Sequence, residues 1–433
     1  LSIYQNKKGE DMQNETLAIH AGYDKKAGEK TMAVPIYQST AYAFNNAEHA
    51  ANLFALKELG NIYSRLTNPT TAVLEARFAA YDEALAAVAT ASGSSAIFYS
   101  IINLAAAGEN FIAANNLYGG TTALFSYTLK RLGIEVRYFD PTNPSEIEKL
   151  IDDKTRAIFF ESLSNPTIEI VDFEKIVAIA DKYGILTICD NTVATPALFK
   201  PIKVGIDIAV YSTSKYVCGQ GLGIGGMMVD SEKATAKIKA NPRYPHFNEP
   251  DPSYHGLVYA ATPFPLFALR ARIALLRDIG AAPSPFNSWL FIQGLETLAL
   301  RIKAHSEKAL EVAKFLESHP KVKSVKYPGL SSHRDNALLK KYFTDKMASG
   351  LISFEVESYE EAKKIVDSVK LFTPVVNIGD SKSLITHPAS TTHSQLSKEE
   401  LKVAGIGESL VRLSIGLESP VDLIEDLKAA IEG

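Results

Sequence analysis

Lys215 has the sequence surroundings that a covalently acting lysine requires. It lies in Tyr211-Ser-Thr-Ser-Lys-Tyr216, directly after an apolar run and directly before the glycine-rich segment 219–226. Small hydroxyl side chains and bare backbone let a ligand approach closely, and an amine held there suits an imine to a phosphorylated aldehyde. The sequence therefore predicts that Lys215 carries a cofactor of this class.

Asp190 could act on the same cofactor. It ends the apolar run 184–190, upstream of Lys215. A pyridine ring withdraws electrons only while its nitrogen is protonated, and a neighbouring carboxylate maintains that proton. The alternative for Asp190 is a helix cap or a surface turn.

Three further segments could complete such a site. Ala91-Ser-Gly-Ser-Ser-Ala96 lies between a predicted strand and a predicted helix, where free N–H groups bind phosphate, although a serine cap explains the same residues. Tyr118 follows the next predicted strand and could stack on a ring, although a lone aromatic there is more often a core residue. Arg412 lies in an otherwise apolar strand, so its guanidinium needs an anion, either a substrate carboxylate or an internal one.

Two literal motif matches disagree with their context. Ser212-Thr-Ser-Lys215 matches the S-x-x-K of serine penicillin-recognising enzymes, but the chain has no Ser-Asp-Asn and no Lys-Thr-Gly. Gly221-Leu-Gly-Ile-Gly-Gly226 matches G-x-G-x-x-G, but the Met-Met-Val-Asp that follows predicts a strand where a dinucleotide-binding unit has a helix. Close backbone packing explains these glycines better.

Composition excludes several classes of function. The 433 residues are 46% hydrophobic, which is enough for two domains, and a net charge of −4 offers no positive field for nucleic acid. Segment 84–108 is uncharged and long enough to span a bilayer, but its polar centre, Thr90-Ala-Ser-Gly-Ser-Ser95, predicts a strand, a turn and a helix instead. We therefore expect neither a nucleic-acid partner nor a membrane anchor.

Cysteine and histidine usage points to a reduced, metal-free protein. Cys189 and Cys218 lack the spacing of a metal site or a disulfide framework, so we expect two core cysteines in a cytoplasmic chain. The nine histidines show no ligand spacing, and His387 and His393 are placed in a loop near the site.

Alternating apolar strands and helical segments must position these residues. The predicted strands cover 85–90, 111–115, 134–139, 156–161, 185–189, 208–212 and 225–229. Such alternation predicts an α/β fold, with a mostly parallel seven-stranded sheet covered by helices on both faces. A long helical segment through Trp289 and Leu300 then leads to a smaller α+β domain, with strands at 322–327, 351–356 and 410–415 and a helix at 359–369.

The N-terminal region has a different texture. Residues 12–65 predict an extended arm with one helix around 48–59. The first eleven residues lack the apolar core of a secretion signal, and Met12 is interpreted as a native start. We therefore divide the chain into an arm (1–65), a large cofactor-binding domain (66–285) and a small C-terminal domain (286–433).

Taken together, these motifs resemble the Cys/Met-metabolism pyridoxal-phosphate enzymes from about Thr16 to the C-terminus. The resemblance implies a fold type I subunit, like aspartate aminotransferase, in which Lys215 binds pyridoxal 5′-phosphate, Asp190 meets the pyridine nitrogen and Tyr118 stacks on the ring. Four positions match those that bind the cofactor phosphate, namely Gly93, Ser94, Ser212 and Ser214.

Further positions follow from the same resemblance. Tyr63 and Arg65 match a pair that reaches the phosphate in the neighbouring subunit, which implies dimers with shared sites, commonly paired into a homotetramer. Glu161 and Asn165 match positions beside the ring, and Arg412 matches the clamp on the substrate α-carboxylate. Tyr63 and Asn165 are also expected near the substrate.

Three details are most similar to the O-acetylhomoserine sulfhydrylase branch of the family: the insert 249–256, the helical segment 291–298, and Asn377, where lyases usually have Ser. This likeness implies a transferase of methionine biosynthesis that performs γ-replacement on O-acetyl-L-homoserine with sulfide or methanethiol. Lys215 would be its base, Tyr118 a proton carrier, and Asn377 an aid to substrate binding.

Alternatives remain within and outside the family. Cystathionine γ-synthase or methionine γ-lyase activity would use the same cofactor residues, although Gly120 stands where methionine γ-lyase has a cysteine. The alternative outside catalysis is a protein that keeps the fold and has lost the reaction.

Overall fold

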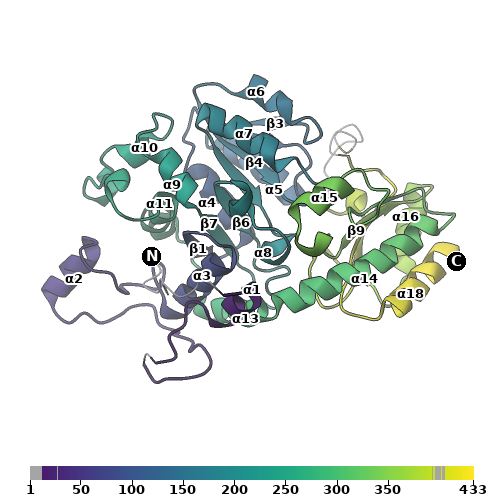
Figure 1. Cartoon of the computed structure of the whole chain (residues 1–433), viewed down its shortest axis with the longest axis horizontal. Helices are drawn as coiled ribbons and strands as arrows, with labels where there is room; N and C mark the ends of the chain where they lie inside the picture. The colour runs from purple at the N-terminus through teal and green to yellow at the C-terminus, as the bar shows by residue number, and fades with distance from the viewer. Residues whose placement is uncertain (1–11, 27, 393, 395–400, 402–404) are drawn as a thin grey trace.

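Seven short apolar strands form the larger sheet of this computed structural model, which describes residues 12–26, 28–392, 394, 401 and 405–433 (Figure 1). The strands are β1 (Ala86–Thr90), β2 (Asn110–Ala114), β3 (Glu135–Phe139), β4 (Thr155–Glu161), β5 (Leu186–Asp190), β6 (Ile208–Tyr211) and β7 (Gly226–Asp230). Each begins and ends within one residue of its predicted limits. The apolar runs of the sequence therefore located this sheet correctly.

The order of the larger sheet, β1-β7-β6-β5-β4-β2-β3, brings the ends of β4, β5 and β6 together. β7 is antiparallel to β1 and β6, whereas the other pairs are parallel. All residues of β1, β2, β4, β6 and β7 are buried. Because successive side chains point to opposite faces of a sheet, this burial means that both faces are covered, which confirms the predicted α/β architecture.

Helices α3, α4, α7 and α11 contact the larger sheet. The helices of the N-terminal two thirds are α1 (Asn14–His20), α2 (Ala47–Phe54), α3 (Pro69–Tyr81), α4 (Gly93–Ile102), α5 (Gly119–Ala123), α6 (Ile147–Leu150), α7 (Phe173–Tyr183), α8 (Thr195–Leu198), α9 (Glu232–Ile238), α10 (Pro245–Asn248), α11 (Leu266–Arg270) and α12 (Arg277–Ile279). The uncharged segment 84–108 thus forms a strand, a turn and a helix, as predicted. Among the described residues, no helix is both long and apolar enough to cross a membrane.

A second sheet of five strands, in the order β10-β11-β12-β9-β8, forms the smaller C-terminal part. Its strands are β8 (Ser324–Lys326), β9 (Leu351–Glu355), β10 (Thr373–Pro374), β11 (Leu384–Thr386) and β12 (Leu410–Ser414), and its helices are α13 (Pro285–Glu296), α14 (Leu298–Ser318), α15 (Asn336–Tyr342), α16 (Tyr359–Ser368) and α18 (Pro420–Glu432). The predictions lacked β10 and β11, because two or three residues are too few to show a period.

Two predictions about helices need correction. The N-terminal region contains α1 as well as the expected helix, since Leu17 and Ala18 of α1 are buried and the helix packs against α3 and α13. The segment through Trp289 is also two helices, because the chain leaves helical geometry at Thr297 (φ −112°, ψ 5°). In Figure 1, α2 and the flanking chain project away from the body of the molecule.

Gly226 allows β7 to pass close to the turn between β1 and α4. A Cβ atom built on Gly226 would lie 2.2 Å from the carbonyl oxygen of Ser92. The atom that it would meet is a backbone oxygen, and the added Cβ would be fixed to the backbone of β7, so neither could move as the end of a flexible side chain would. The glycine-rich segment is thus explained by close packing beside the turn, as predicted.

Replacing Gly226 with Ala should lower the free energy of unfolding by about 1–3 kcal/mol, the usual cost of inserting one carbon into a packed core. The matched control is Gly223→Ala, whose added Cβ would meet Phe291 at an ordinary contact distance of 3.4 Å. Urea unfolding of both variants measures the difference. Equal stabilities would contradict the close-packing explanation.

Candidate active site

A cavity of about 320 Å³ opens at the carboxyl ends of β4, β5 and β6, next to β12 and the chain before β11. The carboxyl ends of parallel strands meet at one edge of a sheet, where side chains from distant segments converge. Eleven of the thirteen predicted site residues line it: Gly93, Ser94, Tyr118, Glu161, Asn165, Asp190, Ser212, Ser214, Lys215, Asn377 and Arg412.

The N-terminus of α4 offers free donors to this cavity. Ser92 caps the helix by accepting a hydrogen bond from Ser95 N–H at 3.0 Å, but the first N–H groups of a helix have no partner within it. Gly93 permits a close approach, because a Cβ there would lie 2.6 Å from Cβ of Ser212. Among the described residues, the hydroxyls of Ser94 and Ser212 form no hydrogen bond with protein. This end of the cavity suits an anion.

Ser214 plays a different part from Ser94 and Ser212. Its hydroxyl accepts a hydrogen bond from Gly225 N–H at 2.9 Å and donates one to Gly225 O at 3.2 Å. The side chain therefore anchors the glycine-rich segment 219–226 to the loop after β6, which carries Lys215. Its contact with a phosphate stays a prediction.

Two carboxyl groups, Glu161 and Asp190, stand side by side because β4 and β5 pair Glu161 with Asp190. Glu161 is fully engaged, since its oxygens accept hydrogen bonds from the N–H groups of Tyr118 (2.7 Å) and Asn165 (3.1 Å). Asp190 accepts one from Thr192 N–H at 3.0 Å through Oδ1. Asp190 is thus the carboxyl group with an oxygen left for a ligand.

Burial raises the pKa of both carboxyl groups. Loss of solvent, followed by the charge of Asp190, places the pKa of Glu161 well above its ordinary value. Loss of solvent also raises the pKa of Asp190 to about 6, although hydrogen bonds from Thr192 oppose the shift. Neither carboxylate forms an ion pair among the described residues, so a cation bound between them and the lysine would relieve this cost.

Lys215 enters the cavity from the loop after β6. Its Nζ donates a hydrogen bond to Oδ1 of Asn377 at 2.6 Å. Burial, followed by the nearby charge of Arg412, lowers the pKa of the Lys215 amine. Such an amine is closer to its neutral, nucleophilic form than an exposed lysine.

Arg412 lies on β12 and reaches the same cavity from the small sheet. It donates from Nη1 to Oδ1 of Asn165 at 3.2 Å and from Nη2 to the carbonyl oxygen of Asn377 at 3.0 Å. Its Nε is buried without a partner. Arg412 forms no ion pair with any residue that the structure describes, which argues against the internal alternative, and the free edge of the guanidinium suits a carboxylate.

Tyr63 and Arg65 do not join the other predicted residues in this subunit. Neither lines the cavity; the Arg65 guanidinium lies 5.1 Å from the centre of the Tyr63 ring, and Tyr63 is 41% exposed. Sequence reasoning in turn missed Thr192, whose hydroxyl accepts a hydrogen bond from Ser212 N–H at 2.8 Å. Its place two residues beyond Asp190, past the strand end, was the available signal.

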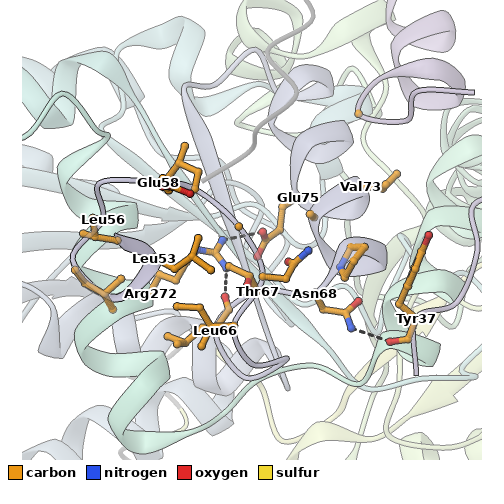
Figure 2. A pocket seen from close by; sticks show the side chains of 18 of the residues that line it. Tyr37, Leu53, Leu56, Glu58, Leu66, Thr67, Asn68, Val73, Glu75 and Arg272 are labelled. Atoms are coloured by element: carbon orange, nitrogen blue, oxygen red, sulfur yellow. Dashed lines mark hydrogen bonds and ion pairs between the residues drawn. The ribbon is translucent and has the colours of Figure 1, made fainter. Parts of the chain in front are cut away.

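A second cavity, of about 540 Å³, lies between the N-terminal region, α3 and the segment Ala271–Leu276 (Figure 2). Its polar wall is a buried ion pair, with Arg272 Nη2 2.7 Å from Glu75 Oε2, and Arg272 also donates to the carbonyl oxygen of Leu66 at 2.7 Å. None of the predicted site residues lines this cavity. The pair fixes the chain just beyond Arg65, where it turns into α3.

The histidine and cysteine predictions can be located in part. His387 is buried, with Nε2 hydrogen-bonded to Glu408 O at 2.7 Å, and does not line the first cavity, while His393 falls outside the described residues. Cys189 and Cys218 are both free and buried, as predicted. Within the described part of the chain, no three His, Cys, Asp or Glu residues are grouped to hold a metal ion.

Comparisons with known proteins agree with this geometry. The family model described as Cys/Met metabolism PLP-dependent enzyme matches residues 15–432. An O-acetyl-L-homoserine sulfhydrylase from Leptospira meyeri is 44% identical, with 96% of both chains covered, and O-acetyl-L-homoserine sulfhydrylase 1 from Thermus thermophilus is 44% identical over 97% of this chain and 100% of that one.

One solved structure is similar over almost the whole fold. It is that of a putative O-acetylhomoserine (thiol)-lyase from Campylobacter jejuni, described as carrying N′-pyridoxyl-lysine-5′-monophosphate. It is 54% identical with a TM-score of 0.96, covering 98% of this chain and 100% of the other.

The raised pKa of Asp190 predicts a pH dependence of stability for the cofactor-free protein. A carboxyl group whose folded-state pKa lies above its unfolded value stabilises the fold below the unfolded pKa, and that contribution is lost as pH rises through the folded pKa. From about pH 4 to 6, wild-type stability should therefore fall by up to about 3 kcal/mol relative to Asp190→Asn.

Denaturant unfolding of the apoprotein across this pH range measures the effect. Asp345→Asn, at an exposed turn, is the matched control and should follow the wild-type curve. Parallel curves for wild type and Asp190→Asn would contradict the assignment of a raised Asp190 pKa.

Proposed function

Because the chain belongs to the Cys/Met-metabolism PLP-dependent enzymes, we propose that it performs γ-replacement on O-acetyl-L-homoserine, with sulfide giving L-homocysteine and acetate. Methanethiol as the nucleophile would give L-methionine. The observation that carries this proposal is the convergence of the predicted lysine, carboxylate, aromatic and arginine residues on one cavity.

Pyridoxal 5′-phosphate fits the groups present in the cavity. Gly93, Ser94 and Ser212 would hold its phosphate, because their free donors surround the N-terminus of α4. Asp190 would hold the proton of the pyridine nitrogen, which would give its half-buried carboxylate a cationic partner. Lys215 would bind the aldehyde carbon. When bound, the cofactor supplies an electron sink for charge that develops at the substrate α-carbon.

Arg412 would orient the amino-acid substrate. The buried, unpartnered Nε lies beside an Nη group, and this planar edge can donate two hydrogen bonds to a carboxylate. Asn165 and Asn377 hold the other side of the guanidinium in place. The substrate α-carbon would then lie between Arg412 and Lys215.

Lys215 would move the α-proton once its amine is free. Its lowered pKa favours the neutral amine, which is the form that accepts a proton. Asn377 accepts a hydrogen bond from this amine at 2.6 Å and so limits where Nζ can lie. γ-Replacement also requires a β-proton to leave as acetate departs from the γ-carbon, before the thiol adds there. The Tyr118 hydroxyl is the candidate carrier for that proton.

The arm 1–65 is proposed to complete the cavity of a neighbouring subunit. Tyr63 is exposed and Arg65 stays away from the cavity of its own chain, although both match a phosphate-binding pair. We therefore extend the proposal to dimers with shared sites, paired as a cytoplasmic homotetramer. In this division, 66–285 binds the cofactor and 286–433 supplies the substrate clamp.

Lys215→Ala should abolish both turnover and the visible absorbance of the bound cofactor. Lys203→Ala, at an exposed lysine paired with Glu83, is the control and should retain both. Product analysis with O-acetylhomoserine plus sulfide, plus cysteine, or without a thiol separates the sulfhydrylase from cystathionine γ-synthase and γ-lyase. A coloured, active Lys215→Ala enzyme would reject the assignment.

Mixing two inactive variants tests the shared site. Lys215→Ala keeps an intact arm, and Tyr63→Phe combined with Arg65→Ala keeps an intact lysine. Random reassociation should restore about one quarter of wild-type activity, because half the dimers contain one complete site. If the arm served its own subunit, mixing would restore nothing, which steady-state assays before and after reassociation would show.

A further inference from the structure

Four buried polar side chains form a hydrogen-bonded chain next to the proposed active site without lining its cavity. Ser162 Oγ donates to Asn191 Oδ1 at 2.7 Å, and Asn191 Nδ2 donates to Tyr211 Oη at 3.1 Å. Tyr211 Oη in turn donates to Oδ2 of Asp82 at 2.6 Å. Asp82 directly follows α3, and α3 packs on β1. The hydrogen-bonded network therefore connects the helix layer to three neighbouring strand ends.

Three members of this hydrogen-bonded network directly precede or follow a cavity residue in the sequence. Ser162 follows Glu161, Asn191 follows Asp190, and Tyr211 precedes Ser212. Successive side chains of extended backbone point to opposite sides, so each tethered residue lies behind one that faces the cavity. The tether therefore acts on the backbone that carries both carboxylates and a predicted phosphate ligand.

Burial makes this arrangement stiff. Asp82, Ser162 and Asn191 are 0% exposed and Tyr211 is 1% exposed, so water cannot replace a broken bond. Breaking any bond would leave a buried polar group unsatisfied, which costs more than the bond itself contributes. Asn191 is held further by a bond from Nδ2 to Phe199 O at 2.8 Å.

Asp190 depends on such support because little else holds its carboxylate. Among the described residues, its carboxylate accepts hydrogen bonds from Thr192 alone, which belongs to the same turn. The placement of the carboxylate relative to a bound ring therefore follows the backbone at 190–192, and Asn191 anchors that backbone.

We propose that Tyr211 is a positioning residue, whose hydroxyl acts through Asn191 and Ser162 to fix Asp190 and Glu161 at the edge of the cavity. This inference rests on the proposed function, since it assigns the tether to the cofactor end of that site. It predicts that Tyr211 contributes to cofactor binding and turnover although it contacts neither cofactor nor substrate.

Tyr211→Phe tests the proposal against a matched control, Tyr244→Phe. The Tyr244 hydroxyl is equally buried and joins β4 and β5 at the ends away from the cavity, donating to Arg156 O at 2.7 Å and accepting from Leu186 N–H at 2.9 Å. Both variants lose a buried tyrosine hydroxyl that bonds protein groups and does not line the cavity. Only Tyr211→Phe should lower the affinity for pyridoxal phosphate and kcat by about tenfold, a typical effect of groups that orient ligands from behind.

Cofactor titration, the absorbance spectrum of the bound cofactor across pH, and thermal unfolding of the apoprotein provide the readouts. Tyr211→Phe should shift the spectrum or its pH midpoint, whereas Tyr244→Phe should change only the unfolding temperature. If the two variants match in affinity, spectrum and kcat, the proposal is overturned. If wild type itself binds no pyridoxal phosphate, the proposed function fails instead.

Ser162→Ala provides a second test that removes only the distal donor. Like Tyr211→Phe, it should lower the affinity for the cofactor. The effects of the two substitutions on kcat should not add in the double variant, because coupled members of one network are not independent. No effect of Ser162→Ala on cofactor affinity would count against the tether even if Tyr211→Phe failed to fold. Where both variants fold, full additivity of their effects would also count against it.

Discussion

Desolvation of charge is the constraint on which this site depends. Glu161, Asp190, Lys215 and Arg412 line one cavity and are buried or half-buried, yet no two of them form an ion pair among the described residues. Glu161 accepts two backbone N–H groups, whereas the other three are satisfied only in part, by backbone groups or an amide. Burying charges without direct partners is costly, and a molecule that carries a phosphate, a protonated ring and a carboxylate would complete them together.

Glycines at two positions let the backbone segments that carry the site pack closely against each other. Gly93 lies against Ser212, and Gly226 lies against the carbonyl of Ser92, so two strand ends and one helix start converge without intervening side chains. Parallel strand order places the two carboxylates next to each other, and β12 of the second sheet adds the guanidinium. Strands therefore position the two carboxylates and the guanidinium, and the loop after β6 positions Lys215.

The sequence predicted the strands and most of the cavity lining, because polar residues at the ends of apolar runs must meet at one sheet edge. Contacts between distant positions were beyond its reach. Tyr211 and Asp82 are 129 positions apart, and nothing in either segment marks the pair. The engagement of Glu161 with two backbone N–H groups, and of Ser214 with Gly225, likewise depends on loop paths that composition and period do not encode. The strands β10 and β11 were not predicted, because two or three residues are too few to show an alternating pattern.

The bare α-carbon of Gly120 decides where the aromatic wall of the cavity can stand. A Cβ at this position would lie 2.6 Å from an edge carbon of the Tyr118 ring. Any larger amino acid would have to push the phenol aside, and the space beside the reacting carbons would change shape with it. The absence of a side chain at Gly120 thus fixes how near the Tyr118 ring can lie to the start of α5, and with it the shape of this wall.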